Sequence, residues 1–315
     1  LYVNTTGSSN VAMGRDALQA NTTASNNTAI GHSSLYANTT GTENTALGAN
    51  ALDANTTANS NTAVGYSSLG ANTTGTLNVA LGKDALRDNT TAGANTAVGT
   101  VSMRLNTTGA SNTAVGYGSL DTNTTGGNNV AIGRDSLTAN TTASANTAVG
   151  YAAGASNTTG GLTAFGYRAA YSNTTGNTQS AFGTDALYFT TTGADNSAFG
   201  AFALKANTTG ANNTAVGYNS LTANTTGTQG TAVGRNAGAA NTTGNYNTFI
   251  GDGSGDANTT GASNTAIGQD SLGANTTGAT NTALGRNALL ANTTAANNTA
   301  VGYASLSANT TGTGL

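Results

Sequence analysis

Residues 72–93 read NTTGTLNVALGKDALRDNTTAG, a stretch that starts with Asn-Thr-Thr and comes back to Asn-Thr-Thr after seventeen residues. The same return recurs from Asn4 to Asn309, with one residue missing before Asn173 and with Thr190 in place of one Asn. Numbered from the first Asn, the consensus of the unit is N-T-T-G-x-x-N-T-A-V-G-x-x-S-L-x-A. We therefore predict that residues 1–315 form a single repeat array of about eighteen 17-residue coils. We expect this array to be an excerpt of a longer chain.

The length and content of the unit favour strands over helices. Repeats built from helix pairs need about 33 to 47 residues, and glycine and β-branched residues are weak helix formers. Positions 8 and 10 would share one face of a short strand, while position 9 points the other way. The sequence predicts an all-β fold, a parallel β-solenoid (β-roll) in which equivalent residues stack about 4.8 Å apart.

Three classes of recurring residue are expected to hold the coils together. Asparagines in register should form hydrogen-bonded ladders, here Asn38, Asn55, Asn72 and Asn89 at position 1 and Asn61 and Asn95 at position 7. Glycine at position 11 should supply a bend with positive φ, as at Gly48, Gly65, Gly82 and Gly99. The apolar residues of positions 10 and 15 are the predicted core, among them Val64, Leu69, Leu81 and Leu86.

Two features of the unit leave alternatives open. The alanine of position 9, replaced only at Phe249, either faces inward in a narrow coil or lies at a contact between subunits. Because two large apolar side chains per coil are few against the entropy of ordering seventeen residues, we expect lateral association to add burial. The two threonines of Asn-Thr-Thr should point in opposite directions, so that one row lines the interior.

The composition argues against several function classes. Charged residues make up 7% of the chain and the net charge is −3, so no basic surface for nucleic acid is expected. No apolar run is long enough to span a membrane, and without cysteine there is no disulfide scaffold. The lone His32 looks like a surface variant, and neighbours such as Arg15 and Asp16, Lys83 and Asp84, or Arg134 and Asp135 look like exposed pairs of little energetic weight. We predict no enzyme activity, no catalytic residue, no cofactor and no metal.

Three local patterns have a functional and a plain structural interpretation. The stretch GDGSGDAN at residues 251–258 is either a calcium loop or, as we favour, one irregular coil marked by Gly253 and Gly255. Each Asn-Thr-Thr is formally a glycosylation sequon, but a stacked asparagine explains the repetition better. Tyrosine recurs at position 12, where it either covers a turn or forms a surface row that binds glycans or a neighbouring fibre, at Tyr66, Tyr117, Tyr151, Tyr167, Tyr218 and Tyr303.

The segments NTAVGYSSLGANTTG (residues 61–75) and NTAIGHSSLYANTTG (residues 27–41) resemble repeats of fibre-forming bacterial and phage proteins, including phage tail fibres. Their N-T-A-V-G core is similar to the β-roll head repeats of trimeric autotransporter adhesins, although the unit here is longer. The resemblance implies a rigid, homo-oligomeric fibre or adhesin stalk, extracellular, on the cell surface or on a virion.

These observations together predict a structural, non-enzymatic filament that forms a rigid rod for surface attachment or scaffolding. Its partners would be copies of itself, end to end or side by side, and a cell-surface glycan. Two other functions stay open. One is a glycan-binding phage tail fibre. The other is an ice-binding solenoid, against which the opposite directions of adjacent threonines argue.

Overall fold

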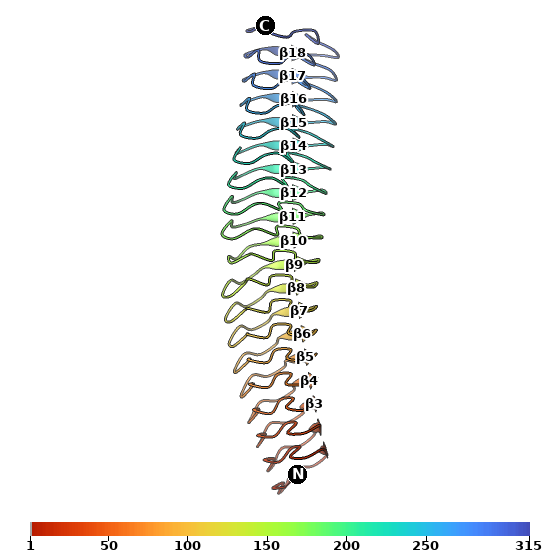
Figure 1. The fold of residues 1–315 in the computed structure, drawn as a ribbon, viewed down its shortest axis with the longest axis vertical. Helices are drawn as coiled ribbons and strands as arrows, with labels where there is room; N and C mark the ends of the chain where they lie inside the picture. The colour runs from red at the N-terminus through yellow and green to blue at the C-terminus, as the bar shows by residue number, and fades with distance from the viewer. Residues whose placement is uncertain (1) are drawn as a thin grey trace. The chain divides into compact units, whose positions relative to one another are not determined.

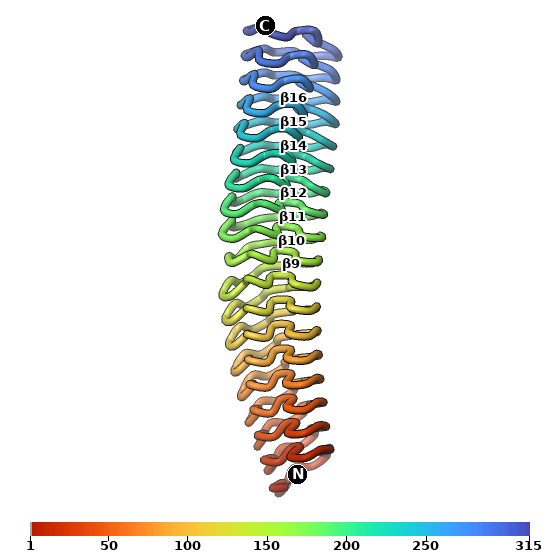
Figure 2. Tube along the Cα trace, in the orientation of Figure 1, coloured from red at the N-terminus to blue at the C-terminus, as the bar shows by residue number. Residues whose placement is uncertain are grey.

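The computed structural model describes residues 2–315 as an all-β chain of coils about seventeen residues long, each contributing one strand of three residues. The chain divides into two compact units, the first ending at Gly160 and the second spanning Gly161–Leu315. Within each unit the backbone makes successive circuits that stack on one another (Figures 1 and 2). The prediction of a parallel β-solenoid is confirmed.

Each unit contains nine strands. Those of the first unit are β1 (Val11–Met13), β2 (Thr28–Ile30), β3 (Thr45–Leu47), β4 (Thr62–Val64), β5 (Val79–Leu81), β6 (Thr96–Val98), β7 (Thr113–Val115), β8 (Val130–Ile132) and β9 (Thr147–Val149). Those of the second are β10 (Thr163–Phe165), β11 (Ser180–Phe182), β12 (Ser197–Phe199), β13 (Thr214–Val216), β14 (Thr231–Val233), β15 (Thr248–Ile250), β16 (Thr265–Ile267), β17 (Thr282–Leu284) and β18 (Thr299–Val301).

Neighbouring strands pair in parallel with a constant offset of one unit. In the first unit Ala63 lies opposite Ala80, and in the second Ala215 lies opposite Ala232. Hydrogen bonds between coils also continue outside the strands: the Leu69 N–H donates to the Ala85 carbonyl at 2.9 Å. The short strands are therefore only part of a backbone ladder that follows most of the circuit, which satisfies the polar groups of the turns.

The strand direction corrects part of the predicted core. Position 9 points inward, since Ala63 and Ala80 are completely buried, whereas positions 8 and 10 face outward. Leu81 is 46% exposed and Val64 is half-buried, so both were wrongly placed in the core. Of the two interpretations of the position-9 alanine, the inward one is correct. Position 15 is buried as predicted at Leu69 and Leu86, both 0% exposed.

Two columns of asparagine occupy the interior together with the position-9 alanines and the position-15 leucines. At position 1 the Asn72 Nδ2 donates to the Asn55 Oδ1 at 3.1 Å and to the Gly75 carbonyl at 2.9 Å. At position 7 the Asn61 Oδ1 accepts the Asn78 backbone N–H at 2.9 Å, while the Asn61 Nδ2 donates to the Gly75 carbonyl at 2.9 Å. Burying these amides is tolerable because they are hydrogen-bonded.

The residues predicted as ladders all stand in these columns. The position-1 column runs through Asn38, Asn55, Asn72 and Asn89 at 2.9–3.1 Å. The position-7 column includes Asn61 and Asn95, which are also fully buried. Sugar transfer to an Asn-Thr-Thr sequon requires a free Nδ2, and in the sequons from Asn21 to Asn292 the asparagine is buried and its Nδ2 is hydrogen-bonded, as at Asn72. Asn4 is exposed and Asn309 is half-buried.

The threonines that follow position 1 differ from the expectation. The second residue is half-buried and bonds the next coil, as where the Thr73 Oγ1 donates to the Thr90 carbonyl at 3.1 Å. The third, represented by Thr74, is exposed. Neither row fills the interior, which the asparagines already occupy.

Each circuit closes through left-handed backbone at four positions. Glycine at position 11 has φ near +130°, with +135° at Gly82. A Cβ added there would lie 2.6 Å from the Gly99 carbonyl oxygen, so both the torsion and the close approach require glycine. Positions 6, 13 and 15 are also left-handed but carry side chains, as with Leu77, Asp84 and Leu86 at φ of +61°, +54° and +53°.

These torsions correct the interpretation of residues 251–258. Gly253 and Gly255 have φ of +64° and +57°, close to the +54° and +53° of Asp270 and Leu272 in the next coil. The coil is therefore regular in its backbone. Its exceptional feature is Phe249, fully buried at position 9; a Cβ on Gly255 would lie 2.4 Å from the ring. The phenylalanine thus fills the space that a position-15 leucine occupies elsewhere.

Candidate interaction surface

The charged side chains gather on one edge of the coils, which we call the variable corner and define as positions 12, 13, 16 and 17. Every lysine and arginine of the chain lies there: Arg15, Lys83, Arg87, Arg104, Arg134, Arg168, Lys205, Arg235 and Arg286. All the acidic residues lie there except Glu43 and Asp195, which stand at position 6. Positions 1, 7, 9, 11 and 15 vary much less because they are taken up by ladders, bends and core.

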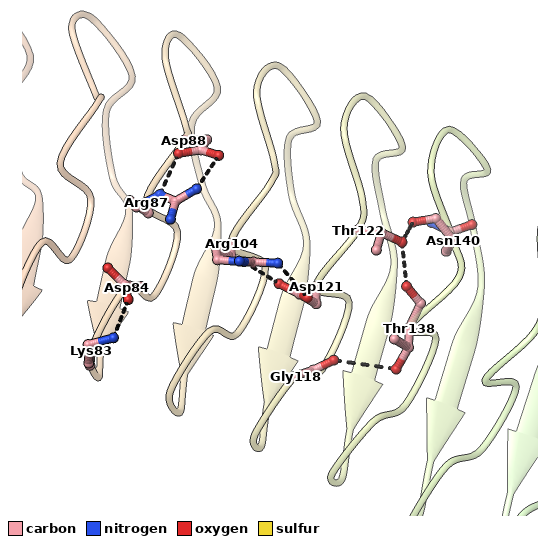
Figure 3. A network of polar contacts seen from close by, with 10 residues as sticks. All are labelled: Lys83, Asp84, Arg87, Asp88, Arg104, Gly118, Asp121, Thr122, Thr138 and Asn140. Carbon is pink, nitrogen blue, oxygen red and sulfur yellow. Dashed lines mark hydrogen bonds and ion pairs between the residues drawn. The ribbon is translucent and has the colours of Figure 1, made fainter.

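In the first unit the variable corner carries ion pairs in which each carboxylate pairs with one cation (Figure 3). Within one coil the Lys83 Nζ lies 2.8 Å from the Asp84 Oδ2, and between coils the Arg104 Nε lies 3.0 Å from the Asp121 Oδ1. These side chains are partly solvated, so each pair adds little stability. The charges cancel within each pair.

Hydroxyl groups continue the same row toward the end of the first unit. The Thr138 Oγ1 donates to the Asp135 carbonyl at 2.7 Å, and the Thr122 Oγ1 bonds the Thr138 carbonyl (Figure 3). The polar side chains drawn in Figure 3 therefore bond mainly one another or the backbone of a neighbouring coil.

The corner of the second unit holds an aromatic and ionic network that spans four coils. The Arg168 guanidinium lies over the rings of Tyr167 and Tyr188, at 4.8 and 4.6 Å from their centroids. Its Nε and Nη2 donate to the two carboxylate oxygens of Asp185, both at 2.9 Å. This hydrogen bonding holds the pKa of Arg168 above its ordinary value. The Asp185 Oδ2 also lies 3.3 Å from the Lys205 Nζ.

Further rings extend this network on both sides. Tyr171 stacks on Tyr188 with centroids 5.2 Å apart, and Phe189 meets the edge of Tyr188 at 4.6 Å. Lys205 lies over the ring of Phe202 at 4.8 Å. Each contact fixes a ring against its neighbour, so the surface is held in one arrangement.

The six position-12 tyrosines all reach solvent, but they do not form one uniform site. Exposed fractions run from 43% at Tyr151 to 75% at Tyr303. Tyr117 lies under the Arg134 guanidinium at 5.5 Å, Tyr167 contacts Arg168, and Tyr218 meets the edge of Phe202 at 5.7 Å. Only Tyr167 and Tyr218 belong to the network of the second unit.

The outward strand face forms a second regular surface. Position 8 presents threonine hydroxyls that, within residues 2–315, donate to no protein group, and position 10 presents exposed apolar side chains such as Leu81. In the second unit Phe165, Phe182 and Phe199 stack along this face, with centroids 5.1 and 4.8 Å apart. Sequence reasoning placed position 10 inside and therefore missed this row.

The remaining candidate residues are dispersed. Across residues 2–315 no three His, Asp or Glu side chains converge as a metal site would require. In the glycine-aspartate stretch Asp252 pairs with Arg235 at 3.0 Å, and burial, followed by the charges of Asp270 and Asp252, raises the pKa of Asp256. His32 is exposed at position 12 of the variable corner.

No protein-family model matches this chain, and no curated protein is similar to it at a significant level. Within the described residues, no helix has the length and apolar character needed to cross a membrane. The aromatic network of the second unit was not predicted, although the distribution of aromatic residues along the sequence contains a signal for it. Five of the six phenylalanines and four of the eleven tyrosines fall within residues 165–218.

Proposed function

We propose that this chain is the body of an extracellular fibre: a non-enzymatic, stiff element that spaces or attaches a surface. The observation that carries the proposal is the register of the backbone and asparagine ladders, which repeats through most coils and is interrupted only at Leu162, Gln179, Thr190 and Gly230. The Asn55–Asn72 bond and the Leu69–Ala85 bond both join adjacent coils. Bending or stretching such a stack must break many hydrogen bonds together, which suits a mechanical role.

The resemblance to fibre-forming repeats supports the location on a cell surface or virion and the association with further copies. The outward row of position 10 offers apolar side chains for lateral contact, as at Leu47, 44% exposed, and Leu284, 43% exposed. Contiguous exposed apolar surface is typical of association sites. A cell-surface glycan is the external partner that such an attachment fibre would use.

Electron microscopy of the full chain, combined with mass measurement by light scattering, tests this proposal. A fibre body should appear as elongated particles of constant width, with a chain number that grows with concentration if lateral contact occurs. Compact particles of low axial ratio would reject it.

A second candidate, ice binding, is favoured by the outward position-8 threonines, whose hydroxyls repeat at the coil spacing and are free to order water. Against it, the row is interrupted by Val79, Val130, Ser180 and Ser197. Thermal hysteresis measured on the full chain separates the two functions: its absence dismisses ice binding and leaves the fibre proposal unaffected.

A further inference from the structure

The aromatic network of the second unit is a local departure from an otherwise uniform array. We call it the aromatic platform and define it as Tyr167, Arg168, Tyr171, Asp185, Tyr188, Phe189, Phe202, Lys205 and Tyr218. Its members come from four successive coils but always from positions 12, 13, 16 or 17. The platform is therefore a row of rings and charges along the stacking direction.

The platform exposes its rings while holding them rigidly. Phe189 is 48% exposed, Tyr167 48% and Tyr218 50%. Each of these rings contacts a neighbour in the platform: Phe189 meets Tyr188 and Tyr218 meets Phe202 in T-shaped pairs. The Arg168 guanidinium lies over the Tyr167 ring. Rings that are already ordered lose little conformational entropy when a ligand covers them.

The platform also carries an uncancelled positive charge. Asp185 is the only carboxylate in the described residues that two cations share, and its side chain is 4% exposed. Elsewhere the ion pairs are one to one, as between Arg104 and Asp121. The surplus charge lies among ring faces, which exclude part of the water. An incoming anion would therefore be attracted more strongly than at the better solvated ion pairs of the first unit.

We propose that the aromatic platform binds an acidic polysaccharide, a linear glycan whose sugars carry carboxylates. The C–H bonds of a sugar ring pack on the electron-rich face of an aromatic ring, while a sugar carboxylate can pair with Arg168 or Lys205. The stepwise placement of rings suits a polymer lying along the stack. This inference rests on the proposed attachment role for its biological meaning, but not for its test.

A protein partner fits this surface less well than a glycan. The buried centre of a protein interface is depleted of charged residues, whereas here Arg168, Asp185 and Lys205 stand in the middle of the rings. Covering them with a dry protein surface would cost desolvation of the surplus charge. A sugar chain keeps hydroxyls and water beside the charges while it covers the rings.

Affinity electrophoresis of the full chain tests the proposal, with polygalacturonate, hyaluronate or polysialic acid in the gel and dextran as the neutral control. We expect retardation by at least one acidic polymer, none by dextran, and weaker retardation as salt is added. Tyr218→Ala should reduce the affinity at least tenfold, and Arg168→Gln should do the same. The matched control is Tyr66→Ala, which removes a position-12 tyrosine of 52% exposure outside the platform; its affinity should change less than twofold.

Several results would overturn the proposal. They are absence of retardation by all three acidic polymers, equal retardation by dextran, or equal loss in Tyr66→Ala and Tyr218→Ala. Concentration-dependent dimerisation that Tyr218→Ala abolishes would assign the platform to a second copy of the chain instead. Circular dichroism should show that Tyr218→Ala folds normally, since its side chain is half exposed. Because retardation in the gel and particle shape are separate measurements, failure to bind a polysaccharide would leave the fibre proposal standing, and compact particles would leave the binding result standing.

Discussion

Replacing Asn72 by alanine tests whether the buried ladder stabilises the coils. Asn72 takes part in three bonds: from its Nδ2 to the Asn55 Oδ1 and to the Gly75 carbonyl, and from the Asn89 Nδ2 to its own Oδ1. The Gly75 carbonyl keeps the Asn61 Nδ2 as a donor, and Asn89 keeps the carbonyl of position 4 in its own coil. The Asn55 Oδ1 loses its donor and is left buried.

The magnitude follows from these partners. Each lost hydrogen bond costs about 0.5–1.5 kcal/mol, and an acceptor left buried without a donor costs about 1–3 kcal/mol. Because these contributions overlap, we expect Asn72→Ala to lower the free energy of unfolding by about 3–5 kcal/mol. The control is Thr74→Ala, two residues away, where the side chain is exposed. This substitution should change the free energy of unfolding by about 0.5 kcal/mol or less.

Hydrogen exchange of the native chain, read by mass spectrometry, is the suitable assay, because a long repeat array need not unfold in one step. Amides of the coils on either side of Asn72 should lose protection, while the second unit should not. Asn72→Thr is an informative intermediate, since the chain itself uses Thr190 at this position and the Asn207 Nδ2 lies 3.4 Å from its hydroxyl. If Asn72→Ala and Thr74→Ala exchanged alike, the ladder would contribute nothing and the account of the core would fail.

Three further outcomes are expected from urea unfolding. Leu81→Thr should lower the free energy of unfolding by about 1 kcal/mol or less because its side chain faces outward, whereas Leu86→Ala should lower it by about 2–5 kcal/mol. Equal losses would refute the assignment of position 10 to the outer face and position 15 to the core. Phe249→Ala should lower the free energy of unfolding by about 3–5 kcal/mol. Gly255→Leu alone should also destabilise the chain, but added to Phe249→Ala it should recover part of the loss. If the effects of the two substitutions on stability were strictly additive, the two side chains would not share one space. Burial raises the pKa of Asp53, so the folded chain binds that proton more tightly than the unfolded chain and gains stability as the pH falls through the raised value. Asp53→Asn should therefore be more stable than the parent at neutral pH, with a difference that shrinks on acidification; a constant difference would refute this.

The period and the ladders could be predicted because stacking in register leaves a direct trace in the sequence. A residue that must bond its own copy in the next coil has to recur every seventeen residues, as Asn55 and Asn72 do. The bend at Gly82 was predictable for the same reason: a neighbour's backbone stands where a Cβ would be.

The direction of the strand was not predictable from hydrophobicity, which placed Leu81 inside. The asparagine columns and the position-15 leucines already fill the narrow interior, so only alanine fits at position 9. Variation carried the missing signal. Position 9 keeps one small side chain except at Phe249, which has glycine in place of a neighbouring leucine, whereas position 10 ranges from valine to phenylalanine. A tightly packed inward position accepts side chains of nearly one volume, whereas an outward position accepts side chains of many sizes.

The constraints of stacking also determine where a functional difference between coils can arise. Positions 1, 7, 9, 11 and 15 are committed to ladders, bends and core, and the large side chain of Phe249 at position 9 occurs where Gly255 leaves space for it. The variable corner carries no such constraint, because its groups contact mainly one another and solvent. It can exchange an ion pair such as Arg104–Asp121 for rings such as Tyr171 and Tyr188 without altering the coil beneath. A stack of this kind can therefore gain a binding surface in a few adjacent coils while all its coils keep the same backbone.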